Sequence, residues 1–411
     1  MKAWLMAQCD FYIERKHRRC GMTCRAGTAR CVIHAETTDK RVPCPLDPNH
    51  SVWENSLHKH LRKCNKLKQR HLNDGEEFFE EDINTSDADS SLNHSSLNYE
   101  ESTQDVLDSI ALVEQICQDF PEISIEQKTN EYMETHRMLQ LPSNKKHALQ
   151  QSSLIQHMVD SGMLGPHRVF IEFGCGRAEL SRYVNQVEIL RGECEEASLP
   201  KFLLIDRGTN RMKFDKKFGD DSLELANITS GRSRVRRYRI DIKDLKLAAL
   251  LEEERTHVTI SKHLCGAATD LTLRCLHKSG LQRFGGICIA MCCRHCCDPG
   301  EYINGEYIRA LLSEHHSQLS YHRFFKSLMK MCSWATCGRR QGMQDEDVGD
   351  HFTGLTVSKR EELGRMARRI LDEGRIKWVK DRGFDARLVK YVEQDISLEN
   401  VAMLVMPKFI E

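Results

Sequence analysis

The sequence lacks any long hydrophobic run: its longest apolar stretch, Ile287 to Cys293, has the length of a strand. A membrane-spanning helix needs roughly 20 apolar residues, so we expect no membrane span. Also missing is a secretory signal, because the first residues turn charged after about ten positions and contain no small-residue cleavage site. Without a signal, the 18 cysteines indicate thiols and metal ligands, not a disulfide framework. We therefore expect an intracellular protein, in the nucleus, the cytoplasm or both.

A net charge is lacking too, since 60 Lys and Arg balance 60 Asp and Glu, but the charges are segregated. Residues 1–72 hold 15 basic against 6 acidic side chains, residues 73–135 hold 1 against 18, and the remaining 276 hold 44 against 36. Two basic modules joined by an acidic segment favour a polyanionic partner, whereas the simpler interpretation is a set of solvated charged faces. The length of 411 residues predicts two or three domains.

The acidic segment is poor in apolar residues and rich in Ser, Asn, Asp and Glu. We predict a disordered linker over residues 73–104. Helical periodicity returns at Val106 and again from Lys145, which indicates helices over about 105–162 that pack onto the domain following them. This last domain is predicted to span residues 105–411.

Residues 39–72 carry two cysteines and two histidines at metal-ligand spacing, Cys44-x5-His50-x9-His60-x3-Cys64. The last two lie one turn apart on a predicted helix, and the first two flank a turn. Two thiolates and two imidazoles form a closed tetrahedral zinc set, which is structural because no position stays open for water. In so short a segment the metal must supply most of the folding free energy.

A second zinc module of the Cys3His type is predicted for residues 1–38. Two ligand sets fit, and spacing alone does not choose between them: Cys9, Cys20, Cys31 and His34, or Cys20, Cys24, Cys31 and His34.

Basic side chains crowd both modules: Arg15, Lys16, Arg18, Arg19, Lys59, Arg62, Lys63, Lys66, Lys68 and Arg70. Phe11, Tyr12 and Trp53 are interleaved with them. Phosphate contacts combined with base stacking are how small modules bind RNA. The alternative is that the aromatic side chains form the small core of each module.

From Arg168 onward, candidate strands alternate with helical stretches. The strands are expected at 168–173, 202–206, 236–240, 257–261, 286–291 and 401–406. This alternation predicts an α/β fold with a mostly parallel, doubly wound sheet and helices on both faces. Ligands of such sheets bind outside the carboxyl ends of the strands.

Acidic residues and glycines stand at those strand ends: Glu172, Gly174, Gly176, Asp206 and Asp241. The sequence GCGRAE lacks the last glycine of a dinucleotide fingerprint, and no Walker lysine is present. An acid two residues before a Gly-x-Gly turn favours S-adenosylmethionine, whose positive groups need a nearby carboxylate. The two aspartates are then expected to bond the ribose and the adenine. The alternative is a dinucleotide-binding or cofactor-free domain of the same fold.

The ends of the fourth and fifth strands carry side chains suited to catalysis: Lys262 and His263, then Arg294 and His295. Four cysteines lie among residues 292–297, and we favour pocket-lining thiols over a third metal site because consecutive cysteines cannot easily face one ion. The apolar, small-residue segment at 331–338 is expected to be a loop that closes the site. Two basic runs, at 213–218 and 231–239, are candidates for contact with a phosphate backbone.

Several motifs, taken together and in this order, resemble the eukaryotic tRNA 2′-O-methyltransferases that act on the acceptor stem. They are CPLDPNH with HLRKC, FIEFGCG, SKHLCG, IAMCCRHCCD, SWATCG and SLENVAMLVMP. The resemblance covers nearly the whole chain. It implies a class I methyltransferase fold, S-adenosylmethionine as donor, methylation of the ribose at the fourth tRNA nucleotide and two zinc modules. Its register supports Cys9 over Cys24 as the first zinc ligand.

The chain departs from the family pattern at Ala178, where a third glycine is usual, and in short connections near 276–286 and 344–350. A methyl group at Ala178 is expected to crowd the turn, whereas the short connections indicate variable surface loops.

A ribose hydroxyl is a weak nucleophile, so the enzyme must align it and help to remove its proton. Lys262 and His263 are the candidates for orientation or base catalysis, and His295 and Arg294 are expected near the nucleotide and its phosphates. Two other functions remain open: an RNA-binding adaptor with a non-catalytic domain, and a methyltransferase acting on a base or a protein. We expect no membrane partner and see no sign of an obligate protein partner.

Overall fold

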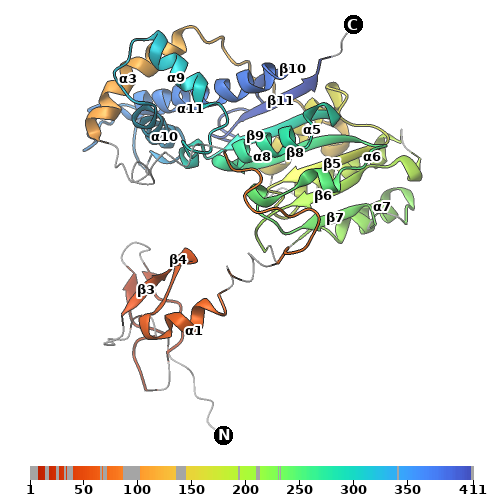
Figure 1. The fold of residues 1–411 in the computed structure, drawn as a ribbon, viewed down its shortest axis with the longest axis horizontal. Coiled ribbons are helices and arrows are strands. Elements are labelled where there is room, and N and C mark those ends of the chain that lie inside the picture. Colours follow the sequence, from red (N-terminus) through yellow and green to blue (C-terminus); the bar gives the residue numbers. More distant parts are fainter. Residues whose placement is uncertain are drawn as a thin grey trace. The chain divides into compact units, whose positions relative to one another are not determined.

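The computed structural model in Figure 1 describes residues 8–13, 18–24, 27–31, 34, 40–64, 67, 72–86, 102–135, 145–192, 195–209, 213–229, 231, 233–339 and 342–408. Several basic residues expected to contact RNA lie outside these ranges: Arg15, Lys16, Lys66, Lys68 and Arg70. The chain forms two compact units, Met1–Glu76 and Glu77–Glu411. Across the ranges described, no helix is long and apolar enough to cross a membrane.

The first unit is built from short elements around buried cysteines. Its elements are β1 (Tyr12–Ile13), β2 (Arg18–Arg19), β3 (Arg41–Cys44), β4 (Asp47–Trp53) and α1 (Leu57–Leu61). Strands β1 and β2 pair antiparallel, as do β3 and β4. The buried cluster of its first half consists of four cysteines, with no aliphatic or aromatic member among the described residues. So small an apolar core stabilises little by itself, which is the situation in which a bound metal decides folding.

A seven-stranded sheet forms the centre of the second unit. Its strands are β5 (Arg168–Phe173), β6 (Lys201–Ile205), β7 (Val235–Tyr238), β8 (Thr256–Cys265), β9 (Phe284–Cys292), β10 (Phe384–Lys390) and β11 (Val401–Pro407). The order across the sheet is β10-β11-β9-β8-β5-β6-β7, and all neighbours are parallel except that β11 is antiparallel to both β9 and β10. The predicted α/β fold with a mostly parallel sheet is confirmed. Strand β10 was not predicted.

Helices cover both faces of this sheet and form a bundle at one end (Figure 1). They are α3 (Thr103–Gln118), α4 (Glu131–Met133), α5 (Lys145–Asp160), α6 (Glu179–Arg191), α7 (Lys217–Ala226), α8 (Ala267–Lys278), α9 (Gly305–Glu314), α10 (Tyr321–Cys337) and α11 (Val357–Lys380). Helices α5 and α6 bury apolar side chains against one face, while α8 and the end of α11 do so against the other. A third core joins α3, α9, α10 and α11.

The segment 331–338, expected to be a loop, instead ends helix α10, so that expectation was wrong. Its apolar residues belong to the third core, where Trp334 is buried. Its small residues admit a neighbouring helix: a Cβ added to Gly364 of α11 would lie 2.7 Å from the amide nitrogen of Ala335. The composition therefore reflects close packing of two helices.

The predicted disorder of the acidic segment is wrong for residues 77–86, which we call the strap. The strap runs along the second unit, where Phe78 and Phe79 pack against the core. Phe79 also forms an isolated antiparallel β-bridge with Leu245. Asn84 is buried and its side-chain amide donates to the carbonyls of Ile242 and Leu245, each at 2.7 Å. The contacts of Phe78, Phe79 and Asn84 thus order this segment in spite of its acidic composition. Residues 87–101 of the expected linker lie outside the described ranges.

Candidate functional site

The chain turns sharply where β5 ends. Gly174 and Gly176 have φ angles of +61° and +50°, a left-handed conformation that glycine adopts without steric cost. Ala178, the residue before α6, is also left-handed at φ +63°, and its buried methyl group packs in the core. Alanine therefore occupies this position in a left-handed conformation that costs it backbone strain.

Glu172 lies directly before this turn with its carboxylate fully buried. Its Oε2 accepts hydrogen bonds from the hydroxyl of Ser181 at 2.5 Å and from the backbone N–H of Ser181 at 3.2 Å. Among the described residues, no basic side chain forms an ion pair with it. Burial raises the pKa of Glu172 to about 7, while Ser181 and the more distant cations Arg237 and Lys262 act to lower it. A buried carboxylate without a cationic partner fits the positively charged end of S-adenosylmethionine.

Asp206 and Asp241 follow β6 and β7 at the same edge of the sheet. The Asp206 carboxylate accepts from the backbone amides of Gly176 at 2.7 Å and Gly208 at 2.6 Å, so it ties the glycine turn to the next strand. Asp241 accepts from the amide of Lys243 at 3.3 Å. A carboxylate has about four acceptor sites, so both aspartates retain capacity for ligand hydroxyl or amine groups.

Arg237 fixes the outer side of the glycine turn, a role that the sequence did not reveal. Its guanidinium pairs with Asp215 in a bidentate manner, at 2.7 and 2.8 Å, and also donates to the carbonyl of Gly176 at 3.0 Å. Arg234, from the same basic run, is buried and donates to the carbonyl of Pro200 at 2.7 Å. These two arginines therefore support the pocket, and the expectation that their run follows a phosphate backbone is wrong for both.

Lys262 and His263 lie at a β-bulge near the end of β8. Lys262 faces Ala290 of β9 and Leu264 faces Met291, so His263 is the extra residue, with φ +71°. Bulges re-aim side chains next to ligand sites, and the His263 side chain is exposed here. At the bulge, a largely buried strand thus presents two side chains, those of Lys262 and His263, that are suited to contact a ligand.

A third side chain joins them from α5: the Nδ1 atom of His147 lies 3.2 Å from the Nζ of Lys262. Burial lowers the pKa of Lys262, against the opposing charges of Glu179 and Glu172. Partial desolvation and then the Lys262 ammonium lower the pKa values of both His147 and His263, which favours neutral imidazoles able to accept a proton. His147 was missed in the sequence because it precedes the sheet by more than twenty residues and carries no motif.

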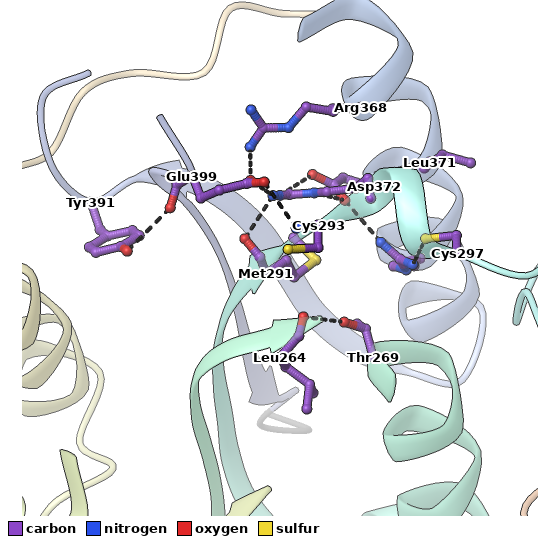
Figure 2. Close-up of polar contacts among 12 residues, drawn as sticks. Leu264, Thr269, Met291, Cys293, Cys297, Arg368, Leu371, Asp372, Tyr391 and Glu399 are labelled. Carbon is purple, nitrogen blue, oxygen red and sulfur yellow. Dashed lines mark hydrogen bonds and ion pairs between the residues drawn. The ribbon is translucent and has the colours of Figure 1, made fainter. Parts of the chain in front are cut away.

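Arg294 does not reach this edge, so its predicted position near the nucleotide was wrong. It is fully buried in an ion-pair network (Figure 2), where it pairs with Asp372 at 2.7 Å and with Glu399 at 2.6 Å. Arg375 shares Asp372 at 3.2 Å and pairs with Asp270 at 2.7 Å. Charge compensation explains why so polar a residue sits in the interior. The sequence did not reveal these partners because they lie up to about a hundred positions away.

His295 is half-buried beside that network, and its Nδ1 atom is buried without a hydrogen-bond partner in the described part of the chain. Its role near the substrate stays a prediction.

The first zinc module brings four predicted ligands together. The ligand atoms of Cys9, Cys20, Cys31 and His34 all lie within 4.8 Å of one another. The sulfurs of Cys20 and Cys31 are 3.9 Å apart, close to the edge of about 3.8 Å expected for a tetrahedron with Zn–S bonds near 2.3 Å. Cys24 stands outside this group, and its thiol donates to the carbonyl of Ala29 at 3.4 Å.

The second module likewise brings together Cys44, His50, His60 and Cys64, again within 4.8 Å. Its two sulfurs are 3.9 Å apart and the Nε2 of His60 is 3.3 Å from the sulfur of Cys44. Two soft thiolates and two imidazoles in this arrangement fit zinc.

Three parts of the chain match known protein families. The family described as Methyltransferase TRM13 matches residues 149–406. The chain belongs to the TRM13 methyltransferase family. Residues 7–35 match the CCCH zinc finger in TRM13 protein, and residues 41–65 match the U11-48K-like CHHC zinc finger. The resemblance seen in the motifs is thereby confirmed, and the two expected cofactors, S-adenosylmethionine and zinc, agree with a methyltransferase that carries two zinc fingers.

Relatives of this TRM13 family member match along nearly their whole length. The tRNA:m(4)X modification enzyme TRM13 of Saccharomyces cerevisiae is 43% identical, over 98% of this chain and 96% of its own. The enzyme of the same name in Eremothecium gossypii is 45% identical, over 97% and 95%. The mouse tRNA:m(4)X modification enzyme TRM13 homolog is 29% identical, over 97% and 94%. Among solved structures, the plantazolicin methyltransferase BpumL aligns with 74% of this chain and 98% of its own at 12% identity, with a TM-score of 0.27.

Proposed function

We propose that this protein transfers a methyl group from S-adenosylmethionine to the ribose 2′-hydroxyl of the fourth nucleotide in the tRNA acceptor stem. The names of its relatives and the motif resemblance support tRNA as the substrate. The observation that carries the proposal is the edge of the sheet, where a buried unpaired carboxylate and two aspartates adjoin a cluster of one lysine and two histidines.

The donor side of the site is formed by β5, β6 and β7. Glu172 would receive the donor's ammonium group, which also favours its ionised form, and the glycine turn would allow close backbone approach. Asp206 and Asp241 would accept from the ribose hydroxyls and the adenine amine. The donor, when bound, supplies an electrophilic methyl group.

The acceptor side is formed by β8 and α5. Lys262 is within hydrogen-bond reach of His147, so this contact with α5 would hold the Lys262 side chain in place. His263 is exposed on the bulge, and its lowered pKa keeps the imidazole neutral and free to accept the hydroxyl proton, although the same shift makes it a weaker base. Lys262 orients the hydroxyl or the adjacent phosphate. His295 is proposed as a further contact to the nucleotide.

The zinc fingers are proposed to hold the RNA, with Cys9, Cys20, Cys31 and His34 binding one ion and Cys44, His50, His60 and Cys64 the other. Exposed Lys59 lies in α1, exposed Arg62 and Lys63 follow this helix, and Tyr12 is 45% exposed. Trp53 and Phe11 have intramolecular partners, since Arg41 stacks on the first and His34 on the second. The interpretation of aromatic side chains as finger cores therefore suits the half-buried Trp53, whereas Phe11 is 37% exposed and lies outside the buried cysteine cluster.

The decisive experiment is methylation of synthetic tRNA with labelled donor, followed by nucleoside mass spectrometry. We expect label in one 2′-O-methylated nucleoside, and none when nucleotide 4 carries 2′-deoxyribose. Label that persists in the deoxy substrate, or that appears in a base, would overturn the ribose assignment. Label found in protein would favour the protein methyltransferase.

The alternative, an RNA-binding adaptor without catalysis, is tested by isothermal titration with S-adenosylmethionine. We expect binding by the unmodified chain and weaker binding by Asp206→Asn. Asp220→Asn, at an exposed position of α7, is the matched control. No detectable binding by the unmodified chain would favour the adaptor.

A further inference from the structure

Two cysteines stand opposite each other at the ends of neighbouring strands. Cys265 ends β8 and Cys292 ends β9, and the two are paired in the register of the sheet. Residues paired in this way lie about 4.8 Å apart across the strands, within the Cα separation of about 4.4–6.8 Å that a disulfide requires. Their sulfur atoms are 2.8 Å apart. The two thiol groups therefore point toward each other, at the end of β8 that follows the Lys262–His263 bulge.

The spacing differs from that in the zinc modules of the same chain. There, paired thiol sulfurs are 3.9 Å apart, the separation of two ligands on one tetrahedral ion. At 2.8 Å, Cys265 and Cys292 are too close to flank a zinc ion, although Cys293 lies near enough to complete a three-thiol group. The geometry favours a bond between the sulfurs over a metal between them.

The two thiols also differ in access to solvent. Cys265 is exposed, whereas Cys292 is only 4% exposed. The backbone holds them in place, because the amide of Gly266 donates to the carbonyl of Cys292 at 3.2 Å. Gly266 also abuts the following loop so closely that an added Cβ would lie 2.3 Å from the carbonyl oxygen of Cys296. An exposed thiol is thus fixed beside a buried one, as in an attacking and resolving pair.

We propose that Cys265 and Cys292 form a redox-active dithiol that a peroxide converts to a disulfide. The Cys265 thiolate attacks a peroxide oxygen, the O–O bond breaks and, with hydrogen peroxide, Cys265 becomes a sulfenic acid as hydroxide leaves. The Cys292 thiol then attacks the sulfenic sulfur, so that the S–S bond forms, the S–O bond breaks and water leaves. The net change is two thiols and one hydrogen peroxide to one disulfide and two waters, and a thiol reductant reverses it.

Oxidation is linked to the candidate site through one hydrogen bond. The Cys265 thiol donates to the carbonyl of His263, at 3.4 Å, and a disulfide has no proton for this bond. The bulge residue therefore loses a contact when the disulfide forms. Resting on the proposed function, this link predicts that oxidation lowers methyl transfer several-fold and that dithiothreitol restores it.

The test treats the full-length, zinc-loaded protein with hydrogen peroxide, alkylates the remaining thiols and digests the chain with trypsin. Cys265 is the only cysteine of its tryptic peptide, residues 263–274, so its cross-link to the peptide 284–294 is unambiguous. We expect this cross-link, assigned to Cys292 by fragmentation, at peroxide doses that still leave two zinc ions per chain. Cys265→Ser should abolish it, whereas Cys293→Ser and the exposed Cys337→Ser should retain it.

Three outcomes would overturn the proposal. Cys265 could be recovered as a free thiol after the zinc-finger thiols have oxidised, it could cross-link to Cys293 instead, or the reduced protein could contain a third zinc ion that Cys265→Ser removes. The cross-link is measured without any methyl-transfer assay, so its failure and that of the proposed function are distinguishable.

Discussion

Glu172 shows most clearly how a single residue is set up for a ligand at a cost in stability. Its carboxyl group is buried, and its charge is stabilised only by Ser181 and by more distant cations. Burial raises its pKa to about 7, against 4.5 for a free side chain. A cationic ligand would remove this penalty, which links donor binding to the protonation of one residue.

This residue predicts a pH dependence of stability. Because the folded pKa lies above the unfolded one, the unfolded chain releases the proton first, and stability falls as pH rises from about 4.5 to about 7. The loss is on the order of 2–4 kcal/mol for this group. Urea unfolding of the ligand-free protein at several pH values should show a shallower fall in stability for Glu172→Gln than for the control Glu224→Gln, at an exposed position of α7. Identical slopes would contradict the assignment.

Strand β8 places its functional side chains by breaking its own regularity. His263 occupies a left-handed conformation that residues other than glycine adopt at a cost of about 1–2 kcal/mol. The neighbouring hydrogen-bonded pairs hold it there, and Lys262 consequently reaches His147. Strain at this element is therefore a structural feature of the site.

Substitutions at position 263 separate backbone strain from imidazole chemistry. His263→Gly should stabilise the fold or leave it unchanged, since glycine suits the conformation, whereas His263→Val should destabilise it by about 1–3 kcal/mol. Both should lose methyl transfer if the imidazole accepts the proton. Urea unfolding and turnover measured side by side test this, and a glycine variant with normal turnover would assign the position a backbone role only.

At the scale of the whole molecule, each of the two units is stabilised differently. The first has buried cysteines where a domain of its size would need a larger apolar core, while the second has three apolar cores. The strap belongs to the second unit although its sequence is acidic like the segment after it. Stability should thus depend on metal in one unit and on packing in the other.

Cys64→Ala tests this independence. Loss of one of four ligands should unfold the second finger and weaken tRNA binding, because the metal supplies its folding free energy. Donor binding by the second unit should persist, as measured by calorimetry, and Cys24→Ala serves as the control because Cys24 lies outside both ligand groups. Equal loss of tRNA and donor binding in Cys64→Ala would show that the units are coupled.

The strap predicts where a stable catalytic fragment begins. A fragment starting at residue 77 should be more stable than one starting at residue 105 by roughly 2–5 kcal/mol, from two partly buried aromatic side chains and several hydrogen bonds. In the full chain, Asn84→Ala should cost about 1–3 kcal/mol because the carbonyls of Ile242 and Leu245 each lose one of their donors. Urea unfolding measures both, and equal midpoints for the two fragments would refute a stabilising strap.

The sequence was sufficient wherever the signal was local. Local sequence patterns marked six strands, and a carboxylate followed by two glycines marked the end of β5. Prediction was wrong or silent where the partner is remote: Arg294 finds its carboxylates on α11 and near β11, and His147 meets Lys262 across the sheet edge. The acidic composition of the strap predicted disorder, whereas its two phenylalanines pack against the core and order the segment.

The buried charges around Arg294 also bear on the kinetics of folding. Asp372 comes from α11 and Glu399 from the segment before β11 (Figure 2). Asp270 of α8 joins the network through Arg375 of α11, so the network closes only after these distant parts have met. Contacts of such sequence separation are expected late, after the transition state. In stopped-flow measurements, Asp372→Asn should therefore accelerate unfolding far more than it slows refolding. The strength of this ion-pair network then sets the rate of unfolding, and with it the lifetime of the native state.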